Sequence, residues 1–151
     1  NTYEQLRELD ENSNQLKSDA IISAAKVLNA ETEDIANIVV LKKGMTNRSF
    51  LFSCQGEKYI MRIPGEGTNH LIDRQKEEQV YRTILGKGLC DDVIYINASN
   101  GYKITKFIEN ARVCDPFAKE DVIACMKKLR SFHEQKLTVE HEFDLFADTI
   151  L

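Results

Sequence analysis

Residues 43–50 read Lys-Gly-Met-Thr-Asn-Arg-Ser-Phe, a polar turn between two apolar runs. The first run occupies 38–41 and the second begins at 50, so the pattern predicts a β-hairpin with the polar residues at its tip. Gly44 has no Cβ and lets the backbone approach a bulky anion, while Thr46 and Asn47 add hydroxyl and amide donors. The tip is therefore a candidate phosphate-binding loop. Glycine and asparagine are also ordinary turn residues, and these residues alone leave that alternative open.

The composition is that of one globular domain and disfavours two classes of partner. Of the 151 residues, 42% are hydrophobic and 29% are charged, which suffices for one sizeable core. The net charge of −4 gives no basic field for a nucleic-acid backbone. No apolar run approaches the ~20 residues of a membrane-spanning helix, and no leader pattern opens the sequence. We expect a cytoplasmic protein.

Cysteine and histidine show no metal-binding spacing. The four cysteines include no Cys-x-x-Cys pair, so they are expected to be small core residues and no metal site is predicted. His133 lies near Leu129 and Phe132 on a helical pattern, which favours a histidine packed in the core. The chain begins at Asn1 without methionine and ends within a helical pattern, so we expect it to be part of a longer protein.

Hydrophobic periodicity predicts an α+β fold in which helices flank five antiparallel strands. A first amphipathic helix is expected within 1–17, and a second from Ser18 to about Asn29. The expected strands are 38–43, 49–55, 58–63, 92–97 and 101–106, and the other helices are 69–87, 118–135 and one beginning near 142.

Glu77 is the most informative residue of the helix predicted at 69–87. It falls within the apolar stripe of Val80, Tyr81 and Ile84, so its carboxylate points toward the core. An unpaired buried carboxylate would cost several kcal/mol, so a cation from the sheet is expected beside it. Arg62 is the best candidate. In the alternative, Glu77 reaches solvent at the rim and Arg62 points to water.

Alternation along 58–63 places Arg62 on the same face of the sheet as Ile60. On the neighbouring helix, Glu78 is displaced from the apolar stripe toward Arg74 and Arg82. The sequence therefore predicts one glutamate facing the sheet and one facing charged neighbours on its own helix.

Several stretches together resemble the bacterial choline kinases of the choline/ethanolamine kinase family. They are Gly-Met-Thr-Asn at 44–47, Tyr-Ile-Met-Arg-Ile-Pro-Gly-Glu-Gly-Thr at 59–68, Leu-Ile-Asp-Arg at 71–74 with Glu77, Gly-Tyr-Lys-Ile-Thr-Lys-Phe-Ile-Glu at 101–109, and Leu-Arg-Ser-Phe-His at 129–133. The similarity runs from about residue 21 to the end. It implies a protein-kinase-like small lobe with one helix inserted after the third strand.

The resemblance also implies an ATP site. Gly44, Thr46 and Asn47 would form the loop over the phosphates, with Arg62 as the cation of the third strand and Glu77 as its partner. Ile60 and Ile104 would flank the adenine, and backbone groups at Lys106, Phe107 and Ile108 would hydrogen-bond its edge. Two residues depart from the usual kinase pattern: Arg62 replaces a common lysine, and Lys43 stands where a second glycine is frequent.

The resemblance divides the chain into an extension at 1–17, a nucleotide-binding lobe at 18–110 and the start of a helical large lobe at 111–151. A catalytic loop of the type His-x-Asp-x-x-x-x-Asn does not occur, so catalytic and Mg²⁺-binding residues are expected outside this chain. We expect the parent to transfer the ATP γ-phosphate to choline, and this chain alone to be inactive. Two alternatives remain: a related kinase acting on ethanolamine, an aminoglycoside or homoserine, or a non-catalytic interaction module.

The helix predicted at 118–135 has an apolar face that a large lobe would cover in the parent. It consists of Val122, Ile123, Met126, Leu129 and Phe132. An uncovered face of this kind tends to find a partner, so self-association through the C-terminal helices is expected.

Overall fold

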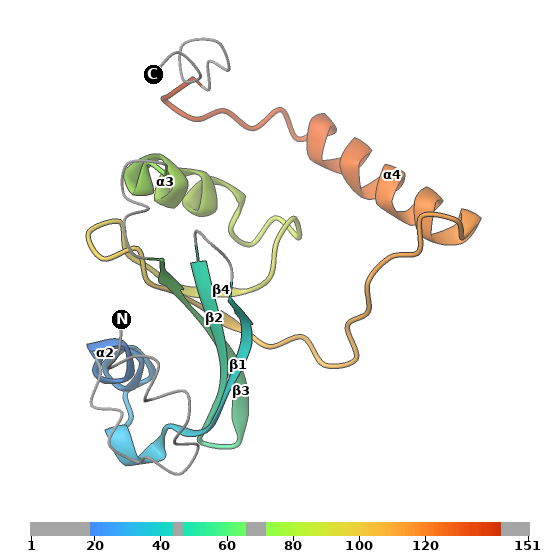
Figure 1. The fold of residues 1–151 in the computed structure, drawn as a ribbon. Helices are drawn as coiled ribbons and strands as arrows, with labels where there is room; N and C mark the ends of the chain where they lie inside the picture. The colour runs from blue at the N-terminus through green and yellow to red at the C-terminus, as the bar shows by residue number, and fades with distance from the viewer. Residues whose placement is uncertain (1–18, 44–46, 66–71, 143–151) are drawn as a thin grey trace.

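The computed structural model describes residues 19–43, 47–65 and 72–142 (Figure 1). Its elements are, in order, α2 (Asp19–Leu28), the 3-10 helix η1 (Thr32–Asp34), β1 (Ala36–Lys43), β2 (Asn47–Cys54), β3 (Glu57–Pro64), α3 (Arg74–Ile84), β4 (Val93–Ile96), β5 (Lys103–Lys106) and α4 (Lys119–Glu134). The α+β class and the five predicted strands are confirmed. The helices predicted within 1–17 and from about 142 onward lie outside the described residues.

The five strands form one antiparallel sheet in the order β1-β2-β3-β5-β4. β2 and β3 pair without a break from Asn47 opposite Pro64 to Cys54 opposite Glu57. In the turn between them, Gln55 has φ 51° and Gly56 has φ 84°. Glycine adopts a positive φ at little cost, which suits it to the second of these positions. α3 is inserted between β3 and β4, as predicted.

The two faces of the sheet carry different helices. Residues opposite each other in an antiparallel pair point to the same face, so Met61 and Ile104 share one face and Arg62 and Lys103 share the other. α2 covers the first face, where Ala20 and other small or apolar residues bury the core. α3 lies on the second face, as its contact between Tyr81 and Lys103 shows. The core therefore sits between α2 and the sheet, and the charged contacts lie on the opposite side.

α3 is shorter than the helix predicted at 69–87. The Asp73 carboxylate caps its first turn by accepting hydrogen bonds from the backbone N–H groups of Gln75 and Lys76 at 3.0 and 3.1 Å. Its last helical residue is Ile84, and Leu85 already has an extended ψ of 135°. Gly86 then adopts φ 71°, so a glycine follows the end of the helix, which lies three residues before the predicted end at 87. Residues 66–71 are not described.

α4 follows an extended segment and stands away from the sheet in Figure 1. All five residues of its predicted apolar face are exposed. His133 is exposed as well, so its predicted core position is wrong in the described structure. Of the cysteines, Cys54 is buried as expected, whereas Cys114 and Cys125 are exposed. No helix among the described residues is long and apolar enough to cross a bilayer.

Candidate functional site

Arg62 on β3 and Glu77 on α3 form the ion pair that the sequence predicted. The guanidinium contacts both carboxylate oxygens: Nη1 reaches Oε1, and Nη2 lies 2.9 Å from Oε2. Nη2 also donates to the carbonyl of Gly101 at 3.3 Å. Arg62 is 9% exposed. A bidentate pair at the edge of the core fixes the direction of the guanidinium before any ligand arrives.

Arg74 is a third member of this cluster. It was predicted to lie beside Glu78, but it contacts Glu77 instead. Its Nη1 lies 2.9 Å from Glu77 Oε2, and its Nη2 lies 3.4 Å from Asn47 Oδ1. With 8% exposure it is as buried as Arg62. The spacing of three residues between Arg74 and Glu77 on one helix is the signal that could have found this contact.

Glu78 pairs as predicted with Arg82 but not with Arg74. Arg82 Nε lies 2.9 Å from Glu78 Oε1. Glu78 Oε2 accepts a hydrogen bond from the backbone N–H of Ala98 at 2.8 Å. This contact connects α3 to the turn between β4 and β5. Glu78 therefore has a structural contact of its own, separate from the cluster.

The cluster of Arg62, Arg74 and Glu77 has two guanidinium groups for one carboxylate. The Nε atoms of both arginines are buried without a hydrogen-bond partner among the described residues. Buried cations are stable only when paired, so a second negative charge suits this position. A phosphate group would supply that charge together with several hydrogen-bond acceptors.

Gly101 allows the cluster to close against the sheet. A Cβ at this position would lie 2.4 Å from Pro64 Cγ and 3.3 Å from Arg74 Nε, and the backbone has φ 68°. Both the close approach and the left-handed backbone require glycine. The turn before β5 thus brings the carbonyl of Gly101 to Arg62 and leaves room for Arg74.

Opposing effects act on the pKa of Glu77. Burial raises this pKa. Hydrogen bonds from Arg62 and Arg74, and then the charges of these arginines, lower it by more than burial raises it, so the pKa of Glu77 lies below its ordinary 4.5. The carboxylate is therefore ionised at neutral pH. A carboxyl whose folded pKa is depressed adds stability above its unfolded pKa, and that contribution is lost as pH falls through the folded value.

Glu77→Gln should therefore flatten part of the acid unfolding profile. We expect the difference in free energy of unfolding between the wild type and Glu77→Gln to be constant above about pH 5 and to shrink as the pH falls below it. Urea unfolding at a series of pH values measures this difference. A difference that grows on acidification would contradict the assigned direction of the shift.

The face beside the cluster contains Ile60 and Thr105, but not Ile104. Ile60 pairs directly with Thr105 across β3 and β5, so these side chains share the face of Arg62. Ile104 points to the other face, where it is 0% exposed in the core beneath α2. The prediction that Ile60 and Ile104 flank one ligand is wrong, because their register places them on opposite faces. Thr105 is the residue of β5 that lies on the face of Arg62, and its side chain is 2% exposed.

The segment after β5 offers fewer backbone donors than expected. The N–H of Lys106 donates to the carbonyl of Asp92 and that of Phe107 to the carbonyl of Lys58, each at 3.0 Å. Within the described ranges, the N–H of Ile108 makes no hydrogen bond, and its side chain is exposed. Of the three predicted residues, Ile108 is therefore the one whose N–H remains available to a ligand edge.

Two of the predicted loop residues, Gly44 and Thr46, lie outside the described residues. Asn47 is the first residue of β2 and pairs with Pro64 of β3. Its contact with Arg74 connects the end of this loop to the ion-pair cluster. No group of three metal-ligating side chains occurs in the described part of the chain.

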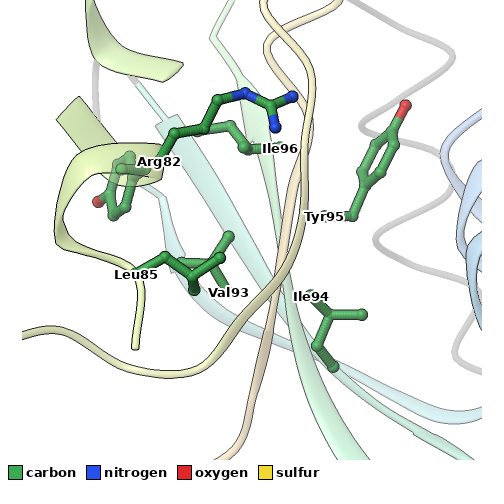
Figure 2. A pocket seen from close by; sticks show the side chains of 7 residues that line it. Arg82, Leu85, Val93, Ile94, Tyr95 and Ile96 are labelled. Carbon is green, nitrogen blue, oxygen red and sulfur yellow. The ribbon is translucent and has the colours of Figure 1, made fainter. Parts of the chain in front are cut away.

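A shallow pocket of about 230 Å³ lies elsewhere, between the end of α3 and the edge strand β4 (Figure 2). Its lining residues are Tyr81, Arg82, Leu85 and 93–96. Leu85 follows the last residue of α3 and Val93 begins β4, so the lining comes from both elements (Figure 2). The lining includes neither the Arg62–Glu77 pair nor the residues after β5, so this pocket is separate from the candidate site.

A fold with these elements and a paired cation on the third strand defines a kinase-like small lobe. The chain is similar to the choline kinase LicA from Streptococcus pneumoniae, with a TM-score of 0.66 and 26% identity over 83% of this chain and 43% of that one. An ethanolamine kinase from Plasmodium vivax shares the fold, with a TM-score of 0.51 and 18% identity over 98% of this chain and 42% of that one.

Sequence comparison gives the same relationship. Two LicA proteins of Haemophilus influenzae, one of them from strain KW20, are 27% and 26% identical to 70% and 69% of this chain. The chain spans only 32% and 40% of their lengths. No family model matches. The resemblance to the choline/ethanolamine kinases is confirmed, and the fold is that of their small lobe.

Proposed function

We propose that this chain is the nucleotide-binding lobe of a choline kinase, which transfers the γ-phosphate of ATP to the hydroxyl of choline. The observation that carries the proposal is the buried cluster of Arg62, Arg74 and Glu77, which faces away from the core and has a net positive charge. Phosphoryl transfer depends on positioning and charge neutralisation, which a pre-oriented guanidinium supplies. The similarity to a choline kinase supports choline as the acceptor.

In this proposal the nucleotide lies along the face of the sheet that carries Arg62. Arg62 contacts the phosphates, Glu77 holds it in place, and Gly44, Thr46 and Asn47 cover the phosphates from the hairpin tip. Ile60 forms the floor beneath the adenine, with Thr105 buried beside it. The N–H of Ile108 donates to the adenine edge, and carbonyl groups near Lys106 and Phe107 accept hydrogen bonds from it. This arrangement follows the faces and free donors described above.

Mg²⁺, the catalytic aspartate and the choline pocket belong to parts of the enzyme that we place outside these residues. Mg²⁺ would neutralise the developing charge on the transferred phosphoryl group. We propose 18–110 as the nucleotide-binding lobe, 1–17 as an extension and 111–151 as the start of a helical lobe. A cytoplasmic location, with access to ATP, is part of the same proposal.

The isolated 151-residue chain should show no choline-dependent ATP turnover, because a small lobe leaves the γ-phosphate without metal ligands or a base. A coupled assay of ADP release with and without choline measures this. The positive control is a longer protein that contains this chain, for which choline should stimulate turnover more than ethanolamine. Turnover by the isolated chain would contradict the proposed division, and a longer protein indifferent to choline would contradict the acceptor.

The isolated chain should also self-associate through α4. Its exposed apolar residues, among them Met126 and Phe132, form a face that a second copy can cover. Sedimentation at several concentrations should show a monomer–dimer equilibrium, which Met126→Glu should shift toward monomer. A wild-type monomer at tens of micromolar, with both residues open to labelling, would contradict this prediction.

A further inference from the structure

Two exposed cysteines lie against each other beside the start of α4. Cys114 belongs to the segment before the helix and Cys125 to its second turn, and their Sγ atoms are 3.4 Å apart. Both are free thiols, and both side chains are exposed. Neither residue takes part in the proposed nucleotide site, so this thiol pair needs a separate explanation.

Contacts on the adjacent residues hold the two thiols together. Arg112 binds Asp121 through two hydrogen bonds, at 2.5 Å for Nη1 to Oδ2 and 2.6 Å for Nη2 to Oδ1. The backbone N–H of Asp115 also donates to Asp121 Oδ2, at 2.8 Å. Asp121 lies one helical turn before Cys125, so the same carboxylate fixes the segment on either side of Cys114 against the face that bears Cys125.

We propose that Cys114 and Cys125 form a site of reversible oxidation, at which a small-molecule disulfide such as oxidised glutathione converts the thiol pair to an intramolecular disulfide. A disulfide bond is about 2.05 Å long, so the sulfurs have only ~1.3 Å further to approach. Because both side chains are exposed, the oxidant can reach them without unfolding the chain. The buried thiol of Cys54 lacks this access.

The exchange balances in two steps. The Cys114 thiolate attacks one sulfur of glutathione disulfide, which forms a mixed disulfide and releases one glutathione thiolate. The Cys125 thiolate then attacks the sulfur of Cys114 and releases the second glutathione. The two protein thiols lose two electrons and two protons, and glutathione disulfide gains both to become two glutathione thiols.

Before oxidation, the Cys125 thiolate should be scarce near neutral pH, and for this reason the first attack is assigned to Cys114. The hydrogen bond to Cys114, followed by the charges of Cys114 and nearby groups, raises the pKa of Cys125 above its ordinary value. Since the thiolate is the nucleophile, closure of the disulfide should accelerate as the pH rises.

Closing the disulfide would join the segment before α4 to the helix and so limit the motion of residues 111–118. This segment connects the end of the sheet to α4 (Figure 1). A crosslink removes conformations from a chain segment, so proteolysis within 111–118 should become slower after oxidation. Reduction with dithiothreitol should restore the original cleavage rate.

The test is to incubate the 151-residue chain with oxidised glutathione, quench with acid, alkylate the remaining thiols and map the peptides by mass spectrometry. We expect a linked peptide pair containing Cys114 and Cys125, with Cys54 still alkylated. Cys114→Ser and Cys125→Ser should each stop at a stable glutathione adduct, and the control Cys90→Ser should form the bridge normally.

A second variant tests the positioning of the thiols. Asp121→Asn should slow bridge formation severalfold, because it weakens the contact with Arg112, whereas Glu134→Gln removes an exposed ion pair on the same helix and should not. The proposal is overturned if the wild type gives only glutathione adducts or intermolecular dimers. It is also overturned if Asp121→Asn and Glu134→Gln close the bridge at the wild-type rate.

Discussion

Glu77→Ala is expected to lower the free energy of unfolding by about 3 to 5 kcal/mol, the usual cost of removing one partner of a buried ion pair. The reason is the geometry of the cluster: Glu77 is the common partner of Arg62 and Arg74, whose side chains are only 11% and 7% exposed. Without Glu77, two buried cations face each other across α3 and β3. Urea unfolding of the isolated chain at neutral pH measures the change.

The matched control is Glu134→Ala, which removes the partner of Arg130 on the exposed surface of α4. A surface pair of this kind contributes about 0 to 1 kcal/mol, so the control should stay within that range. Arg62→Ala is a second comparison for the loss of unfolding free energy. It should cost less than Glu77→Ala, because Glu77 still pairs with Arg74 and no buried charge is left without a partner. Equal losses for Glu77→Ala and Glu134→Ala would show that Glu77 does not stabilise a buried cluster.

Arg62→Ala should reduce kcat of a kinase containing this chain by about a hundredfold to a thousandfold, as expected for loss of a pre-oriented group that stabilises developing charge. Glu77→Gln should also reduce kcat, because the wild-type carboxylate holds the Arg62 guanidinium at 2.9 Å and the variant releases it. The double variant should be little worse than the poorer single variant, since residues that act as a unit lose most of their joint effect together.

Thermal unfolding of each variant separates this catalytic effect from loss of fold. Ser99→Ala serves as the matched control in the turn before β5, because Ser99 lies on an exposed loop and its hydroxyl donates to the neighbouring Asn97. Its kcat should equal that of the wild type. Losses that multiply in the double variant would show that Arg62 and Glu77 act independently.

The sequence was most informative where a contact depends on residues that are adjacent in the chain. The alternation along β3 and the helical stripe around Glu77 each depend on a few adjacent residues, and together they predicted the contact with Arg62. The hairpin of β2 and β3 likewise follows from a turn at Gln55 and Gly56 between two apolar runs. Short patterns of this kind can be interpreted without knowing how distant parts of the chain pack.

The errors concern residues whose environment is set by distant elements. Ile104 and Thr105 are neighbours in sequence, and only their register with β3 decides which of them faces α3. The long side chain of Arg74 reaches either glutamate from its position, and the packing of Asn47 and Gly101 selects Glu77. The thiol pair depends on the path between β5 and α4, which no periodicity predicts.

The most direct test of the central claim is to titrate the isotope-labelled 151-residue chain with ATP and follow its backbone amides by NMR. We expect weak binding in fast exchange, with the largest shifts at Ile60, Arg62 and Ile108, and a marked loss of these shifts in Arg62→Ala. Amides of β4 that line the separate pocket should stay unchanged. If millimolar ATP leaves the face of Arg62 unperturbed, or perturbs β4 instead, this chain is not the nucleotide-binding lobe that we propose.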